Sequence, residues 1–176
     1  MSLQDNVMLD LETTGVSAGC GILSIGACTL DLNNEFYQKI SLASCYDKGL
    51  KDLPSTLNWW ESQDSAVKAE AFSGTLYLQD VLINFAMWLE KLGEKQVKVW
   101  GNGADFDLPI LGAAYLACGM PIPWEPYNGR CFRTVKNIHA EIIPNAFRGM
   151  KHNALQDAKN QAIHLVKIKN AKGFIL

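Results

Sequence analysis

The residues best suited to chemistry are acids that stand close together near the N-terminus. Residues 7–15 read VMLDLETTG, in which Asp10 and Glu12 are two positions apart. In a strand, alternate side chains share a face, so these two carboxylates would project side by side. Neighbouring anions repel, and such a pair requires a cation or a proton, with hard ions such as Mg²⁺ preferring carboxylate oxygens. Taken alone, however, this short spacing is more typical of two solvated acids at a strand end.

A second acidic segment lies at residues 99–111, which read VWGNGADFDLPIL. The pattern predicts a buried strand, a glycine-containing turn and then a helix, a junction that ligands favour in α/β sheets. Asp107 would lie in the first helical turn, where carboxylates are favoured by the helix dipole. We interpret Asp105 as a helix cap and Asp107 as a candidate site residue.

The third segment is KHNALQDA at residues 151–158. Asn153 followed three positions later by Gln156 resembles a capping box, so a helix is expected to begin after Asn153. Five positions along a regular helix would turn two side chains about 140° apart. Because His152 precedes the expected helix, it can still approach the same point as Asp157. Alone, this pattern is also typical of a surface histidine and a solvated acid.

Hydrophobic periodicity and turn residues place these segments on an α/β layer fold with a mixed sheet flanked by helices, in a single domain over residues 1–176. Leu78, Val81, Leu82, Phe85 and Leu89 give the clearest helical spacing, and Gly93 follows as a stop signal. The predicted strands are 7–11, 22–30, 35–42 and 97–100. Asn33 and Asn34 supply the turn between the second and the third of them. The predicted helices are a short one capped by Ser55 or Thr56, then 75–92, 108–117, 133–141 and 153–168. The predicted loops are 44–54, 120–129 and 145–151.

Composition bounds the class of protein. The 176 residues suit one compact domain, and no apolar stretch reaches the ~18 residues of a membrane span. The five cysteines form no CxxC pair, which argues against a disulfide framework or a zinc site and favours a reducing cytoplasm. A net charge of −2 is not that of a protein that binds nucleic acid by charge alone. A nucleic-acid enzyme stays compatible with it, because bound divalent cations would reverse the sign in the cleft.

Together the three segments resemble the DEDDh branch of the DnaQ-like 3′→5′ exonucleases. The motifs DxE, NxxxFD and HxxxxD occur in that order as Asp10 to Glu12, Asn102 to Asp107, and His152 to Asp157. The resemblance runs from about residue 7 to 165. Several sequence segments are similar to those of a small stand-alone exonuclease group of phages and prophages, which is related to a mycobacterial-type exoribonuclease domain. These segments are DLETTG, ILSIGA, PSTLNWW, VKVWGNGADFD and HNALQDA. Two features depart from the pattern: Gly101, where some relatives carry histidine, and the additional acid Asp105.

The resemblance implies a ribonuclease H-like fold with the DxE strand central, the NxxxFD strand beside it and the last helix crossing its face. It further implies two Mg²⁺ or Mn²⁺ ions held by four carboxylates, with His152 as general base for the attacking water. Single-stranded 3′ ends of DNA or RNA would be the substrate and nucleoside 5′-monophosphates the product. The implied metal ligands are Asp10, Glu12, Asp107 and Asp157.

Substrate contacts and competing functions stay open at this level. The candidate substrate-binding residues are Thr13, Thr14, Asn102, Phe106, Trp59 and Lys151. Of the tandem Trp59 and Trp60, one is expected to stack on a base and at least one to pack in the core. Candidate phosphate contacts are Arg130, Arg133 and Arg148. The alternatives are an endonuclease or small-substrate phosphodiesterase of the same fold, or a nucleic-acid-binding module whose nuclease site has decayed. The oligomeric state is open, and the aromatic loop 121–127 is a candidate interface for a homodimer.

Overall fold

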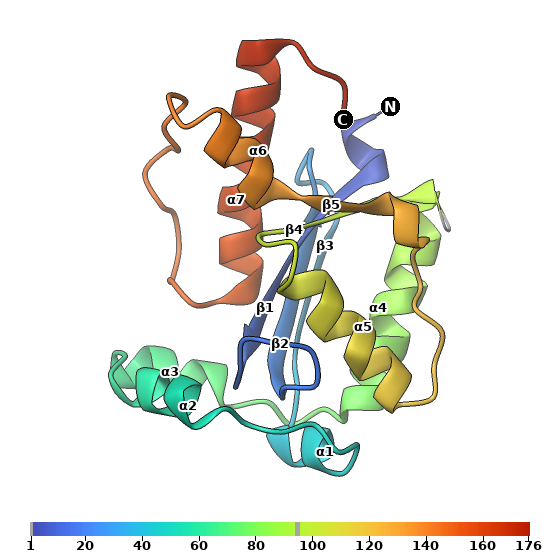
Figure 1. The fold of residues 1–176 in the computed structure, drawn as a ribbon, viewed down its shortest axis with the longest axis vertical. Coiled ribbons are helices and arrows are strands. Elements are labelled where there is room, and N and C mark those ends of the chain that lie inside the picture. The colour runs from blue at the N-terminus through green and yellow to red at the C-terminus, as the bar shows by residue number, and fades with distance from the viewer. Residues whose placement is uncertain (1, 94–95) are drawn as a thin grey trace.

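The sheet is mixed and places the first acid-bearing strand at its centre. The computed structural model describes residues 2–93 and 96–176. Within them the strand order is β3-β2-β1-β4-β5 (Figure 1). The strands are β1 (Asn6–Thr13), β2 (Ile22–Thr29), β3 (Glu35–Lys39), β4 (Lys98–Gly101) and β5 (Gly129–Cys131). The first three pair antiparallel, and β4 is parallel to both β1 and β5. The expected mixed α/β sheet, with the NxxxFD strand beside the DxE strand, is therefore confirmed.

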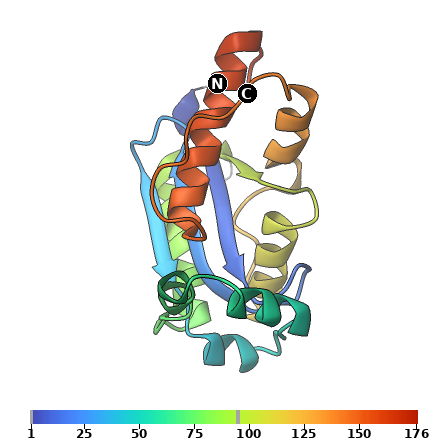
Figure 2. The ribbon, with the colours of Figure 1, turned by 90° about the vertical axis from the view of Figure 1, so that its left-hand side faces the viewer.

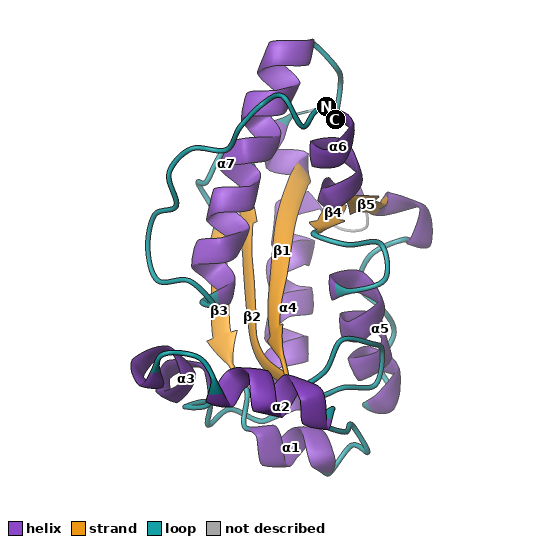
Figure 3. Ribbon diagram, turned by 60° about the vertical axis from the view of Figure 1, so that its left-hand side comes forward, coloured by secondary structure: helices purple, strands orange, loops and turns teal. Residues whose placement is uncertain are grey.

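Helices cover both faces of this sheet (Figure 3). The helix α7 lies across one face, α4 lies behind the other, and α1 to α3 gather at one end of the strands. Figure 2 shows the same layers from a second direction. The helices are α1 (Leu42–Tyr46), α2 (Pro54–Glu61), α3 (Ser65–Ala71), α4 (Leu78–Gly93), α5 (Asp107–Ala117), α6 (Phe132–Ile138) and α7 (Ala154–Lys172). The described residues also form the short 3-10 helices η1 (Leu3–Asp5) and η3 (Pro126–Asn128).

Strand alternation in β1 sorts its side chains between two cores. Val7, Leu9 and Leu11 are buried with apolar residues of α4 and α5. Met8, on the opposite face, is buried with apolar residues of α6 and α7. Asp10 and Glu12 follow Met8 at two-residue spacing and so share the α7 face, as the sequence predicts.

A glycine allows α7 to approach the sheet closely. Gly26 in β2 lies opposite Asp10 in the antiparallel register. A Cβ atom added to Gly26 would lie only 2.1 Å from the carbonyl carbon of Ala154 and the amide nitrogen of Leu155. The start of α7 therefore rests directly on the backbone of β2, beside the first acid.

Gly26→Ala is expected to lower the free energy of unfolding by about 3 kcal/mol or more, since a methyl group cannot fit against a helix backbone. The start of α7 must shift as well. Urea unfolding measures the loss of stability. Gly119→Ala is a matched control with nothing within 4 Å of its added Cβ, although its positive φ carries a smaller strain. Equal stability of Gly26→Ala and wild type would contradict this packing.

Several predicted boundaries were wrong. The strand expected over 35–42 ends at Lys39, and α1 occupies the end of that strand and part of the loop expected at 44–54. Helix α2 begins at Pro54 after the N-cap residue Leu53, not at a Ser55 or Thr56 cap. Proline has no N–H to leave unpaired at the first helical position and its φ is already helical, which explains the earlier start.

Other elements were missed or misplaced at their ends. Helix α3 is new, and its N-cap is Asp64, whose carboxylate accepts a hydrogen bond of 2.8 Å from the Ala66 amide. Strand β5 follows the expected loop 120–129, and α6 ends at Ile138. Helix α7 continues past the expected residue 168 to Lys172, where Gly173 ends it in the left-handed conformation. In the part of the chain that the structure describes, no helix has the length and apolar character needed to cross a membrane.

Candidate active site

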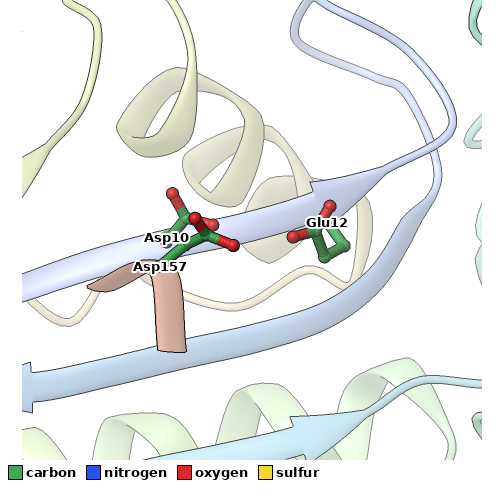
Figure 4. A group of neighbouring side chains, drawn as sticks. All are labelled: Asp10, Glu12 and Asp157. Atoms are coloured by element: carbon green, nitrogen blue, oxygen red, sulfur yellow. The ribbon is translucent and has the colours of Figure 1, made fainter. Parts of the chain in front are cut away.

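Three carboxylates converge where β1 passes under the start of α7. Oxygen atoms of Asp10, Glu12 and Asp157 all lie within 4.8 Å of one another. Figure 4 shows Asp157 beside Asp10, with Glu12 farther along the same strand. Asp157 reaches this point because Asn153 caps the helix, its side-chain oxygen accepting a 3.1 Å hydrogen bond from the Gln156 amide. The structure thus confirms that the side chain of Asn153 caps this helix, which is one half of the predicted capping box.

Burial and mutual repulsion make these carboxylates hard to ionise. Burial, followed by the charges of Asp157 and Asp107, raises the pKa of Glu12 to about 8. Burial and the charges of all three other acids raise the pKa of Asp10 well above its usual range, and that of Asp157 is also raised, chiefly by burial. The structure forms no ion pair between these acids and any lysine or arginine among residues 2–93 and 96–176. The cluster therefore has an unmet requirement for positive charge.

Asp107 lies next to this cluster but is held differently. One of its carboxylate oxygens accepts a hydrogen bond of 3.3 Å from the Leu11 amide, and the other accepts one of 2.7 Å from the Asn102 amide. Its side chain is fully buried, and burial raises its pKa to about 6 against the opposing effect of these amides. Asp107 is not among the three acids whose oxygens meet at one point. It joins β1 to the β4–α5 junction and adds negative charge beside Asp10.

His152 lies in the loop before α7 and faces the cluster across the same cleft. Its φ of +59° is rare for a residue with a side chain. Its ring contacts Trp59 edge-to-face at 4.9 Å between centroids, and Trp60 lies at 6.1 Å. Trp60 is buried and its indole N–H donates a 2.9 Å hydrogen bond to the Thr13 carbonyl. This bond fixes α2 to the end of β1, so the tandem tryptophans position one wall of the cleft.

The cleft has a volume of about 510 Å³ and gathers most of the predicted site residues. The predicted residues that line it are Asp10, Glu12, Thr13, Trp59, Asn102, Phe106, His152 and Asp157. Thr14 does not line it, because it is fully buried with its hydroxyl donating to the Gly21 carbonyl at 3.4 Å. Lys151 is exposed and also lies outside the lining. The hydroxyl of Thr13 donates to the Gly15 carbonyl at 2.7 Å, which leaves its oxygen lone pairs for other contacts.

Gln161 is the most informative residue that sequence reasoning missed. Its side-chain amide donates a 2.7 Å hydrogen bond to Asp10, and its own buried oxygen has no partner. It lies four residues after Asp157, so the two share a face of α7, and that spacing was a usable signal. Val16, Ser55 and Thr56 also line the cleft. Ser55 and Thr56 were considered only as helix caps.

A mixed sheet with two acids on its central strand, and a helix that brings a third across its face, is the architecture of ribonuclease H-like nucleases. The model of the 3′-5′ exoribonuclease Rv2179c-like domain matches residues 5–169, and the chain belongs to this family. A search of curated proteins finds no match. The family supports nuclease activity on nucleic acid, in agreement with the resemblance to a mycobacterial-type exoribonuclease domain. Assignment to the DEDDh branch and to the phage group stays a prediction.

Proposed function

We propose that this protein is a metal-dependent 3′→5′ exoribonuclease that releases nucleoside 5′-monophosphates from single-stranded 3′ ends. The observation that carries the proposal is the convergence of Asp10, Glu12 and Asp157 in a cleft, where no lysine or arginine of residues 2–93 and 96–176 forms an ion pair with them. Clustered carboxylates attract divalent cations. A phosphodiester is negatively charged, and divalent cations neutralise that charge when the bond is hydrolysed.

The donor set fits a hard divalent ion such as Mg²⁺ or Mn²⁺. All the converging ligand atoms are carboxylate oxygens, and one oxygen of Asp157 is buried without any hydrogen-bond partner. Asp10, Glu12 and Asp157 would hold the ions, and Asp107 would add its charge beside them. Bound ions would supply Lewis-acid polarisation of the phosphodiester and acidify the attacking water; the proposal takes two of them, as the family resemblance implies.

His152 would accept the proton of the attacking water. It lines the same cleft as the three acids, and a neutral imidazole is suited to general-base chemistry near neutral pH. The edges of Trp59 and Trp60 restrict the orientation of its ring. The negative charge of Asp157 lies close enough to interact with it and would stabilise the imidazolium that forms.

Matched RNA and DNA oligomers labelled at the 5′ end test the proposal, incubated with Mg²⁺ or Mn²⁺ and separated by length. We expect a ladder that shortens from the 3′ end, faster on RNA, and a complete stop with EDTA. Circular strands should stay intact. Cleavage of circles would favour an endonuclease, and hydrolysis that persists in EDTA would contradict metal dependence.

A further inference from the structure

A second hollow adjoins the acidic cleft. It has a volume of about 590 Å³ and shares Val16 and Phe106 with the cleft as lining residues. Its remaining lining includes the turn at Gly103 and the exposed side of α6 with Arg133 and Asn137. The two hollows therefore adjoin each other at Val16 and Phe106.

Arg133, on the side of α6 that faces this hollow, has no carboxylate of the described residues within ion-pair distance, although its charge opposes the rise that burial causes in the pKa of Asp107. Arg133 lies against Gly103, where an added Cβ would be 3.6 Å from its guanidinium carbon. In the described ranges, Arg133 forms no hydrogen bond and no ion pair. Burial, and next the charge of Arg133, lowers the pKa of Lys136, whose ammonium lies 5.5 Å from the centre of the Phe132 ring. Asp105 also lines the hollow but does not come within ion-pair distance of Arg133.

These charges lie where a bound strand would leave the active site. A cleft of this size encloses a small ligand, so a longer strand with its 3′ end at the acids must continue over the rim. The hollow on the other side of Val16 and Phe106 is lined by Arg133, and arginine is well suited to phosphate oxygens. The acids make the active site itself negative, so the polyanionic strand is expected to follow the positively charged surface beside it.

We propose that this second hollow, called here the Arg133 groove, binds the strand on the 5′ side of the scissile phosphate. Arg133 contacts a backbone phosphate, and Lys136, which does not line the groove, adds positive charge three residues farther along α6. Such contacts position a strand without reading its sequence. The proposal rests on the proposed function, and it makes the enzyme favour oligonucleotides over the smallest substrates.

Arg133→Gln tests the groove on two substrates, an RNA decamer and a dinucleotide whose single phosphodiester is the scissile one. We expect KM for the decamer to rise about tenfold or more, the loss typical of a charged hydrogen bond, while kcat/KM for the dinucleotide falls by a clearly smaller factor, since the charge of Arg133 also acts on Asp107. The dependence of log affinity on log salt for the decamer, measured by fluorescence anisotropy in EDTA, should become shallower by about 0.7. Arg133→Lys keeps the charge and should retain most of the length preference.

Lys169→Gln is the matched control, because Lys169 lies twelve residues after Asp157 on α7, about 18 Å along the helix axis. It removes the same charge and should leave both substrates unaffected. If wild type cleaves both substrates and Arg133→Gln changes them equally, or changes neither, the groove is overturned and the proposed function stands. If wild type cleaves neither substrate with any metal, the proposed function itself fails.

Discussion

The Glu12→Gln variant is expected to lose about 10³-fold or more in turnover and yet to be more stable than wild type in metal-free buffer above pH 7. The loss of rate follows from removing one ligand charge, since metal ions contribute several kcal/mol of charge stabilisation at about 1.4 kcal/mol for each tenfold in rate. The gain in stability follows from the pKa of about 8 that burial and neighbouring acids give this carboxyl.

The sign of the stability effect follows from proton linkage. The unfolded carboxyl ionises near pH 4.5, whereas the folded one keeps its proton up to about pH 8. Between these values the folded state binds more protons, so the stability of the metal-free protein falls as pH rises from about 4.5 to about 8. Above about pH 8 the free energy of unfolding has lost the full contribution of this carboxyl, a few kcal/mol. Glutamine cannot ionise, so Glu12→Gln should show a smaller fall.

Urea unfolding at pH 5, 7 and 9 in EDTA measures this effect. In a second series with saturating Mn²⁺, the wild-type protein should regain the stability that it loses above pH 7. Glu90→Gln is the matched control, because Glu90 is exposed on α4. It should follow the wild-type curve and keep full turnover. Parallel pH curves for Glu12→Gln and wild type would show that burial and the neighbouring acids do not raise the pKa of Glu12 in the folded protein.

The His152→Ala variant is expected to lose turnover by about 10²–10⁴-fold, the usual contribution of a general base, and to stay folded. The alanine removes the ring contacts with Trp59 and Trp60 and the electrostatic interaction with Asp157, whereas Trp60 keeps its hydrogen bond to the Thr13 carbonyl. Saturating metal and substrate isolate the chemical step, and thermal unfolding reports the fold. Metal affinity should be little changed, since the converging carboxylates remain.

His139→Ala serves as its control. His139 stacks on Phe174 and lies 3.8 Å from Glu141, and it does not line the cleft. It should keep wild-type turnover within a factor of a few. Full activity of His152→Ala would remove the general base from the proposed mechanism and leave the metal site untouched.

The sequence predicted those parts of the site that depend on local rules. Strand alternation put Asp10 and Glu12 on one face, and the Asn153 cap fixed where α7 begins, so Asp157 was placed correctly. The central position of β1 came from the family resemblance rather than from periodicity, because periodicity does not report strand order.

Other features depend on contacts between distant segments. The carboxylate of Asp107 is directed by the Leu11 amide, 96 residues away, and no local pattern shows this bond. The contact of α7 with Gly26 is equally remote in sequence. Thr14 was assigned to the substrate because it neighbours the acids, yet the pairing of its carbonyl with Leu53 and its hydroxyl with Gly21 buries it. Helix α3 was missed because it has only seven residues, too few for a clear period.

The left-handed backbone of His152 lowers the stability of the fold at the residue proposed as general base. An L-residue held at φ +59° costs about 1–2 kcal/mol, which glycine would avoid and asparagine would reduce. Directed evolution for heat tolerance alone would therefore accumulate glycine or asparagine at position 152 and, under the proposed mechanism, yield stable proteins that lack the general base. Thermostabilisation of this enzyme requires a screen that scores turnover in every round.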